Sequence, residues 1–67
     1  MLTIQFNGQP MMVNEGTTIE DLIQSAGVSV KFCAVECNLE IVPKGQYATM
    51  LVIDGDSIEV VTLVGGG

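Results

Sequence analysis

The sequence contains no histidine and no tryptophan, and its only basic side chains are Lys31 and Lys44. The lack of histidine removes the residue that most often serves as a general base, proton shuttle or metal ligand. Eight acidic residues against two lysines give a net charge of −6. Nucleic acids and anionic membranes bind clustered lysine or arginine, so we expect neither as a partner. A basic protein partner suits this charge; alternatively, the charge only keeps a small apolar domain in solution.

Cysteine and long apolar runs are also scarce. Cys33 and Cys37 are too few for a disulfide scaffold, and a structural zinc site uses four ligands. On one strand they would lie about 13 Å apart, beyond the roughly 7 Å reach of a disulfide. We interpret them as small buried hydrophobic residues, with a redox pair or persulfide carrier as the alternative. No apolar run approaches a membrane span and no signal peptide opens the chain, so the expected location is the cytoplasm.

The composition nevertheless predicts a folded domain. Hydrophobic residues make up 48% of the 67 residues, which is too many for a disordered segment. A chain of this length forms one domain that buries only about 60% of its unfolded surface. Aromatic residues are few, so aliphatic side chains and methionine must fill the core. We therefore expect no engulfed cofactor.

The first 13 residues carry the pattern of a β-hairpin. Residues 2–6 alternate between apolar and polar side chains at the strand period. Asn7 and Gly8 supply the positive φ angles of a tight turn, and residues 11–13 are the expected returning strand. Because Pro10 cannot donate a hydrogen bond to a sheet, we place it at an edge or at the start of that strand.

A helix is predicted to follow. Thr17 and Glu20 match the Thr-x-x-Glu capping box that opens helices. Gly27 is suited to end the helix in a left-handed conformation. One buried face is predicted from the helical spacing of Ile19, Leu22, Ile23 and Ala26.

The second half of the chain reads as short strands separated by turns. We expect a buried strand over residues 32–37, a turn at 38–39, a return strand at 40–42 stopped by Pro43, and a loop with one helical turn at 44–50. Residues 51–53 precede a turn at Asp54-Gly55-Asp56. The last strand is predicted over residues 57–64, with one face formed by Ile58, Val60, Thr62 and Val64.

This order of elements predicts an α+β domain over residues 1–64. A mixed sheet of about five strands, with the main helix packed on one face, is the ubiquitin-like β-grasp. That fold places the last strand centrally and leaves the C-terminus free at one end. Residues 65–67 are all glycine and pack nothing, so we expect a flexible tail that extends roughly 10 Å.

The side chains offer no recognisable catalytic motif. Asp54-Gly55-Asp56 alone is far from a calcium-binding loop, and no glycine-rich phosphate loop joins a strand to a helix. Glu36 and Glu59 are expected to point outward from their strands. An enzyme with its own active site is therefore a poor interpretation, and the terminal carboxylate is the one candidate reactive group.

Several segments together resemble the ThiS sulfur-carrier family of thiamine biosynthesis. They are Ala34-Val35-Glu36-Cys37-Asn38, Ile41-Val42-Pro43, Asp54-Gly55-Asp56-Ser57-Ile58-Glu59-Val60-Val61 and Val64-Gly65-Gly66-Gly67. The resemblance runs from Leu2 to Gly67. Leu39 departs from it, because family members often carry glycine or a polar residue in that turn.

The resemblance implies a function for the tail. An E1-like adenylyltransferase of the ThiF type would adenylate the Gly67 carboxylate with ATP. A cysteine desulfurase or another sulfur donor would then convert Gly67 to a thiocarboxylate, and a thiazole synthase of the ThiG type would take the sulfur. Gly65 and Gly66 would enter a narrow tunnel in the partner. The partners would supply the catalytic groups, so the chain itself needs no cofactor.

Docking requires a surface as well as a tail. We expect Val61 and Leu63 to form an exposed apolar patch, with Val64 beside them and Glu59 pairing with basic partner residues. In the alternative, the apolar residues pack beneath a loop or complete a second small core, and Glu59 is solvated.

Three other functions stay open. A MoaD-like carrier of molybdopterin synthesis has the same tail chemistry, but such proteins typically carry proline before the final glycines, and residues 61–64 contain none. A protein modifier would link Gly67 to a target lysine. A plain interaction module would carry the glycine tail without using it.

Overall fold

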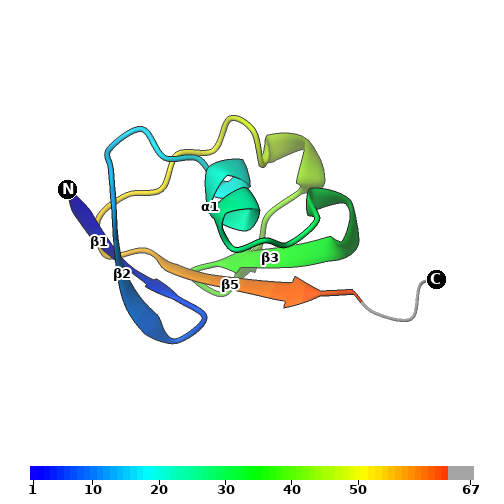
Figure 1. Ribbon diagram of the computed structural model, residues 1–67, viewed down its shortest axis with the longest axis horizontal. Coiled ribbons are helices and arrows are strands. Elements are labelled where there is room, and N and C mark those ends of the chain that lie inside the picture. Colours follow the sequence, from blue (N-terminus) through cyan, green and yellow to red (C-terminus); the bar gives the residue numbers. More distant parts are fainter. Residues whose placement is uncertain (64–67) are drawn as a thin grey trace.

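A computed structural model describes residues 1–63 and shows a five-stranded sheet with one α-helix across one face (Figure 1). The elements are β1 (Leu2–Phe6), β2 (Gln9–Val13), α1 (Ile19–Ser25), η1 (Val30–Phe32), β3 (Cys33–Cys37), β4 (Glu40–Ile41), η2 (Lys44–Gln46) and β5 (Ser57–Thr62). The strand order is β2-β1-β5-β3-β4. β1 and β5 are parallel and the other neighbours antiparallel. The predicted β-grasp fold, with the last strand in the centre, is confirmed.

The β1–β2 hairpin forms as its turn residues predict. Asn7 has a φ of 50° and Gly8 a φ of 81°, the pair of positive values that a type I′ turn requires. Pro10 lies in β2, at an edge of the sheet, opposite Gln5. At an edge its missing N–H leaves no gap in a hydrogen-bonded ladder.

The helix begins one residue later than the sequence predicts. The N-cap is Thr18, whose Oγ1 accepts a hydrogen bond from the Asp21 N–H at 3.1 Å, while Asp21 Oδ2 accepts one from the Thr18 N–H at 3.0 Å. The predicted pairing of Thr17 with Glu20 is therefore wrong. Both pairs have the required spacing, but the backbone of Thr17 is used elsewhere, since its carbonyl accepts from the Val52 N–H at 3.0 Å.

Helix α1 ends earlier than its apolar periodicity predicts, so its buried face is shorter. Gly27 has a φ of 75°, as predicted, and the N–H of Val28 donates to the carbonyl of Ile23 at 3.2 Å, which is the long bond of a Schellman motif. Ala26 is the C-cap and is exposed, so its predicted burial is wrong. Ile19, Leu22 and Ile23 are buried as predicted.

The core lies between α1 and the inner face of the sheet. In β3 every second residue is buried, namely Cys33, Val35 and Cys37. Tyr47 and Val52 close the core from the long segment between β4 and β5. The remaining buried apolar residues are Ile4, Ile19, Leu22, Ile23, Val42 and Ile58. Free Cys33 and Cys37 are thus core residues, as the sequence indicates.

Some strand boundaries differ from the predictions. Phe32 belongs to η1 and is half exposed, so β3 starts at Cys33. β5 ends at Thr62, two residues before the predicted end at residue 64. On the predicted face, Ile58 is buried, Val60 is partly buried and Thr62 is exposed. In the described part of the chain no helix is long and apolar enough to cross a membrane.

Candidate functional site

The residues predicted to carry the chemistry follow directly on β5. Val64, Gly65, Gly66 and Gly67 lie outside the described residues, so their roles stay predictions. The structure does describe what leads to them. Leu63 continues beyond β5, and its N–H donates to the carbonyl of Phe32 at 2.8 Å. The chain therefore approaches its end from the central strand of the sheet, anchored on one side by β3.

The outer face of the sheet, on the side away from α1, is partly apolar. Ile58 is buried on the inner face, so alternation places Ser57, Glu59 and Val61 on the outer one. Val61 is 57% exposed and Leu63 is 49% exposed. The prediction that both are exposed is confirmed, and the alternative that they pack beneath a loop is wrong.

Neighbouring strands extend this surface. Ala34 of β3 lies opposite Val61, and Ile41 of β4, which is 68% exposed, lies opposite Glu36. We call Ala34, Ile41, Val61 and Leu63 the outer patch. Because β4 and β5 flank β3 on either side, the outer patch spans three strands next to the segment that leads to the tail.

Two carboxylates interrupt the outer patch. Glu59 of β5 lies directly opposite Glu36 of β3. Like charges in this position destabilise an antiparallel pair. The two lysines are placed near η1, where Lys44 Nζ donates to the carbonyl of Lys31 at 2.7 Å and Lys31 Nζ lies 5.7 Å from the centre of the Phe32 ring. The carboxylate pair thus forms a negative spot within an apolar surface, suited to a basic group.

A polar network fixes the turns on which the β3–β5 register depends. Asn38 Nδ2 donates to Asp56 Oδ1 at 2.9 Å, and Asn38 Oδ1 accepts from the Ser57 N–H at 2.9 Å. Asp56 is 5% exposed, and its Oδ2 accepts from the Ile53 N–H at 2.9 Å. The sequence predicts turns at both places but gives no sign that one side chain joins them. A buried carboxylate held in this way is structural.

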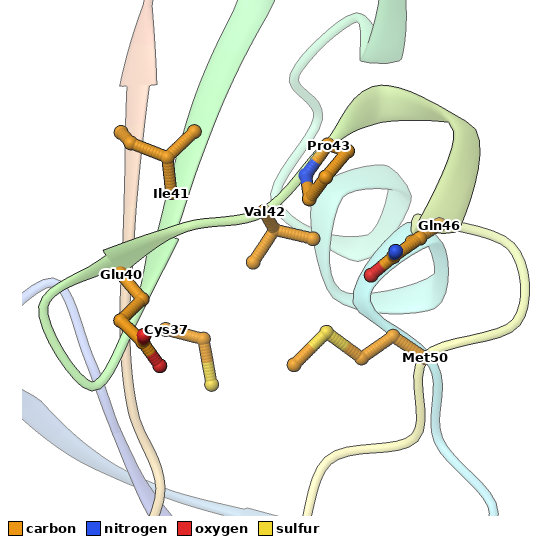
Figure 2. A pocket seen from close by; sticks show the side chains of 7 residues that line it. All are labelled: Cys37, Glu40, Ile41, Val42, Pro43, Gln46 and Met50. Atoms are coloured by element: carbon orange, nitrogen blue, oxygen red, sulfur yellow. The ribbon is translucent and has the colours of Figure 1, made fainter.

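Cys37 lines a cavity of about 200 Å³ that sequence reasoning missed (Figure 2). The cavity lies between β3, β4 and the segment containing η2, and the side chains of Cys37 and Met50 point into it. Burial raises the pKa of the Cys37 thiol above its usual value, and the carboxylates of Asp56 and Glu40 raise it further. A protonated thiol is a poor nucleophile, which disfavours a redox or persulfide role for Cys37.

Within residues 1–63 no group of three or more histidine, cysteine, aspartate or glutamate side chains is arranged to hold a metal ion. Asp54 Oδ1 accepts from the Thr3 N–H at 2.8 Å, so the Asp54-Gly55-Asp56 turn uses its carboxylates to hold backbone. These two carboxylates therefore serve as structural groups of the turn.

Comparisons with known proteins agree with this arrangement. A model of the ThiS family matches residues 4–67. The chain is 42% identical over 66 residues to a thiazole synthase of Paramagnetospirillum magneticum, a match that covers 98% of the chain and 20% of that protein. It is 40% identical over 65 residues to the sulfur carrier protein ThiS of Bacillus subtilis, which covers 96% of the chain and 98% of the relative.

A solved structure shows the same likeness. The crystal structure of the thiamine biosynthesis protein ThiS from Geobacter metallireducens matches with a TM-score of 0.78 at 27% identity. The match covers 98% of this chain and 100% of that one. The chain therefore spans 98% and 100% of these two ThiS proteins but about a fifth of the thiazole synthase.

Proposed function

The chain belongs to the ThiS family, and on that premise we propose that it is a sulfur carrier for thiamine biosynthesis. The observation that carries the proposal is the extent of the family match, which runs through the domain and includes the terminal glycines up to Gly67. A carrier needs a folded domain that a partner recognises and a free carboxylate that the partner modifies. In this proposal the domain is the part that the partner recognises and the Gly67 carboxylate is the part that it modifies, with β5 leading from one toward the other.

The proposed chemistry takes place on the Gly67 carboxylate. One carboxylate oxygen attacks the α-phosphate of ATP in a ThiF-type adenylyltransferase, pyrophosphate leaves, and an acyl-adenylate forms. A persulfide sulfur from a cysteine desulfurase or another donor then displaces AMP, giving an acyl disulfide. Attack by a thiol on that disulfide releases the Gly67 thiocarboxylate. A thiazole synthase of the ThiG type accepts the sulfur in exchange for one oxygen atom, which passes to Gly67 and restores its carboxylate.

Gly65 and Gly66 serve this chemistry by their lack of side chains. A tail without Cβ atoms enters a narrow channel and adopts backbone conformations that other residues resist. The anchor is Leu63, whose N–H is bonded to Phe32. The tail therefore starts from a fixed point, which reduces the number of positions it must search inside the partner.

We assign docking on the activating enzyme to the outer patch together with Val64 and Glu59. Val61 and Leu63 provide exposed apolar area close to the tail. The facing carboxylates of Glu36 and Glu59 favour an approaching basic group by charge. A partner with an apolar surface and an arginine or lysine in its middle fits both features.

The partners supply the catalytic groups in this proposal, and the chain is a co-substrate without enzymatic activity of its own. The thiazole synthase that contains a region similar to this chain supports a functional link between carrier and synthase. We place the function in the cytoplasm, where ATP and reduced thiols are available to these enzymes.

Intact mass spectrometry tests the proposal. The chain is incubated with a ThiF-type enzyme, magnesium, ATP and a sulfur donor, and then weighed. We expect a mass gain equal to replacement of one oxygen by sulfur, absent when ATP is omitted or Gly67 is deleted. Adducts on target lysines would indicate a protein modifier instead. No gain with any activating enzyme tested would overturn the carrier function.

A further inference from the structure

The free edge of β2 presents hydrogen-bonding groups that the described fold does not use. β2 stands at one end of the strand order, and within residues 1–63 its only neighbour in the sheet is β1 (Figure 1). An exposed edge of this kind accepts a further strand unless the protein blocks it.

The bonds of β1 identify which β2 groups point outward. The Thr3 N–H donates to Asp54 Oδ1 at 2.8 Å and the Gln5 N–H to the carbonyl of Asp56 at 2.9 Å, so both face away from β2. Their partners in register are Met12 and Pro10. In an antiparallel pair such partners direct their backbone groups to the opposite side. Met12 therefore offers an N–H and a carbonyl at the free edge, whereas Pro10 offers only a carbonyl.

A groove of about 420 Å³ lies between this edge and α1. The groove has an apolar base, since Leu22 is buried and Met11 and Val13 are partly buried. Asp21 and Ser25 form its helical wall, four residues apart and thus on one side of α1. The other lining residues are Met12, Asn14 and Thr17.

The charge of the groove is negative. Asp21 is the only ionisable residue among those that line it, and the chain as a whole carries a net charge of −6. Lys44 Nζ donates to the backbone carbonyl of Lys31 near η1, and neither lysine lines the groove. A second copy of the chain would bring an equal negative charge against Asp21, so repulsion disfavours self-association through this edge.

We propose that the groove binds an extended segment of a basic partner protein, which adds a strand to β2. The segment exchanges two hydrogen bonds with Met12, places apolar side chains over Leu22 and Met11, and directs an arginine or lysine at Asp21. Addition of a strand to an open edge is a recurrent mode of peptide recognition, in which the backbone gives affinity and alternate side chains give specificity. β1 separates this edge from β5, so the groove stays open while the outer patch and the tail engage another protein.

The test uses a synthetic peptide and does not depend on sulfur transfer. The probe is Thr-Val-Thr-Arg-Thr-Val-Thr with both ends blocked, whose alternation directs valine, arginine and valine to one face. Titration is followed by the amide chemical shifts of the full chain. We expect saturable shifts concentrated at Met12 and on residues 21–25. The same peptide with glutamate in place of arginine should bind at least fivefold more weakly.

Variants of the chain separate the edge from the charge. Met12→Pro removes the one outward N–H without breaking a bond to β1, and it should abolish the shifts. Asp21→Asn keeps an oxygen for the Thr18 cap and removes the charge, and it should weaken binding about two- to fivefold, as expected for a partly exposed ion pair. Glu40→Gln on β4 is the matched control that loses a charge at the opposite edge, and its affinity should equal that of the parent.

Three results would overturn the inference. The first is the absence of shifts at millimolar peptide, and the second is equal affinity for the arginine and glutamate peptides. The third is a dimer of the chain alone that Met12→Pro dissociates, because a second copy would then occupy the edge. In each variant without peptide, β5 amide chemical shifts that equal those of the parent establish that the fold is intact.

Discussion

Glu36 lies directly opposite Glu59 across the antiparallel strands β3 and β5, on the outer face of the sheet. The Leu63 N–H donates to the carbonyl of Phe32, which lies opposite it when the β3–β5 register is continued. Hydrogen-bonded and non-hydrogen-bonded pairs alternate along an antiparallel ladder, and Glu36–Glu59 is an even number of pairs away. Glu36 and Glu59 therefore form a hydrogen-bonded pair, with Cα atoms about 5.5 Å apart. Carboxylates on directly opposed residues of one sheet face repel each other. In the proposed carrier, the repulsion lowers the stability of the free domain and is relieved when a basic partner docks.

Glu59→Lys should therefore stabilise the isolated domain and weaken docking. Replacing a like-charge cross-strand pair with an opposite-charge one adds roughly 0.5–1 kcal/mol to the free energy of unfolding. Urea denaturation at low salt measures this gain, which should shrink at high salt. Glu15→Lys makes the same charge change in a loop and should leave stability within about 0.5 kcal/mol. A destabilised Glu59→Lys domain would contradict the repulsion.

Val61→Thr should separate docking from stability. Threonine keeps the β-branched shape and strand propensity of valine but places a hydroxyl at the centre of the outer patch. Since Val61 is 57% exposed, unfolding free energy should change by less than about 0.5 kcal/mol. The KM for the carrier in adenylation should rise severalfold with little change in kcat. Ile53→Thr, at an exposed loop position, is the control, and equal kinetics for both variants would exclude the patch as the docking surface.

Thr18→Ala should destabilise the chain more than Thr17→Ala. Thr18 caps α1 through its bond with the Asp21 N–H, and loss of such a cap costs about 1 kcal/mol. Thr17 Oγ1 only donates to the carbonyl of Asn14, an exposed bond worth roughly 0.5 kcal/mol. Chemical denaturation of both variants gives the order. The reverse order would mean that the helix starts where the sequence alone suggests.

Stability should fall in alkaline solution because two buried groups resist ionisation. Burial and the carboxylates of Asp56 and Glu40 raise the pKa of Cys37 from 9.0, and burial raises the pKa of Tyr47 from 10.0. As pH rises, the unfolded chain therefore releases these protons before the folded chain does. The stability that the two groups contribute is fully present below about pH 9 and is lost as pH rises further. Unfolding free energy measured from about pH 8 to 11 should decline more gently in Cys37→Ala than in the parent. Parallel profiles would contradict this assignment.

Much of the fold follows from local sequence signals. Asn7-Gly8 forms the hairpin turn because few other residues accept two positive φ angles, and Gly27 ends the helix for the same reason. The spacing of Ile19, Leu22 and Ile23 defines a buried helical face. The position of Ala26 is mispredicted because the Schellman motif ends the helix before its periodicity does.

The candidate site was predictable in part. The alternation of Val61 and Leu63 places both on one side of the last strand, but whether that side is covered depends on where the rest of the chain goes. The exposure of the outer patch and its extension by Ile41 required the positions of β3 and β4. The groove beside β2 likewise needed the bonds of Thr3 and Gln5, which come from segments more than 50 residues away in sequence.

The sequence by itself determined that this protein has no histidine, little positive charge, a β-grasp order of elements and a glycine end, because composition and short-range conformational preferences suffice for these. Only the tertiary structure decided that Thr18 caps the helix, that Glu36 faces Glu59, and that Asn38 joins Asp56 to the β3–β4 turn. These depend on strand register and on the packing of distant segments. A shift of one residue in the β3–β5 register would change the last two of these while leaving every local signal the same.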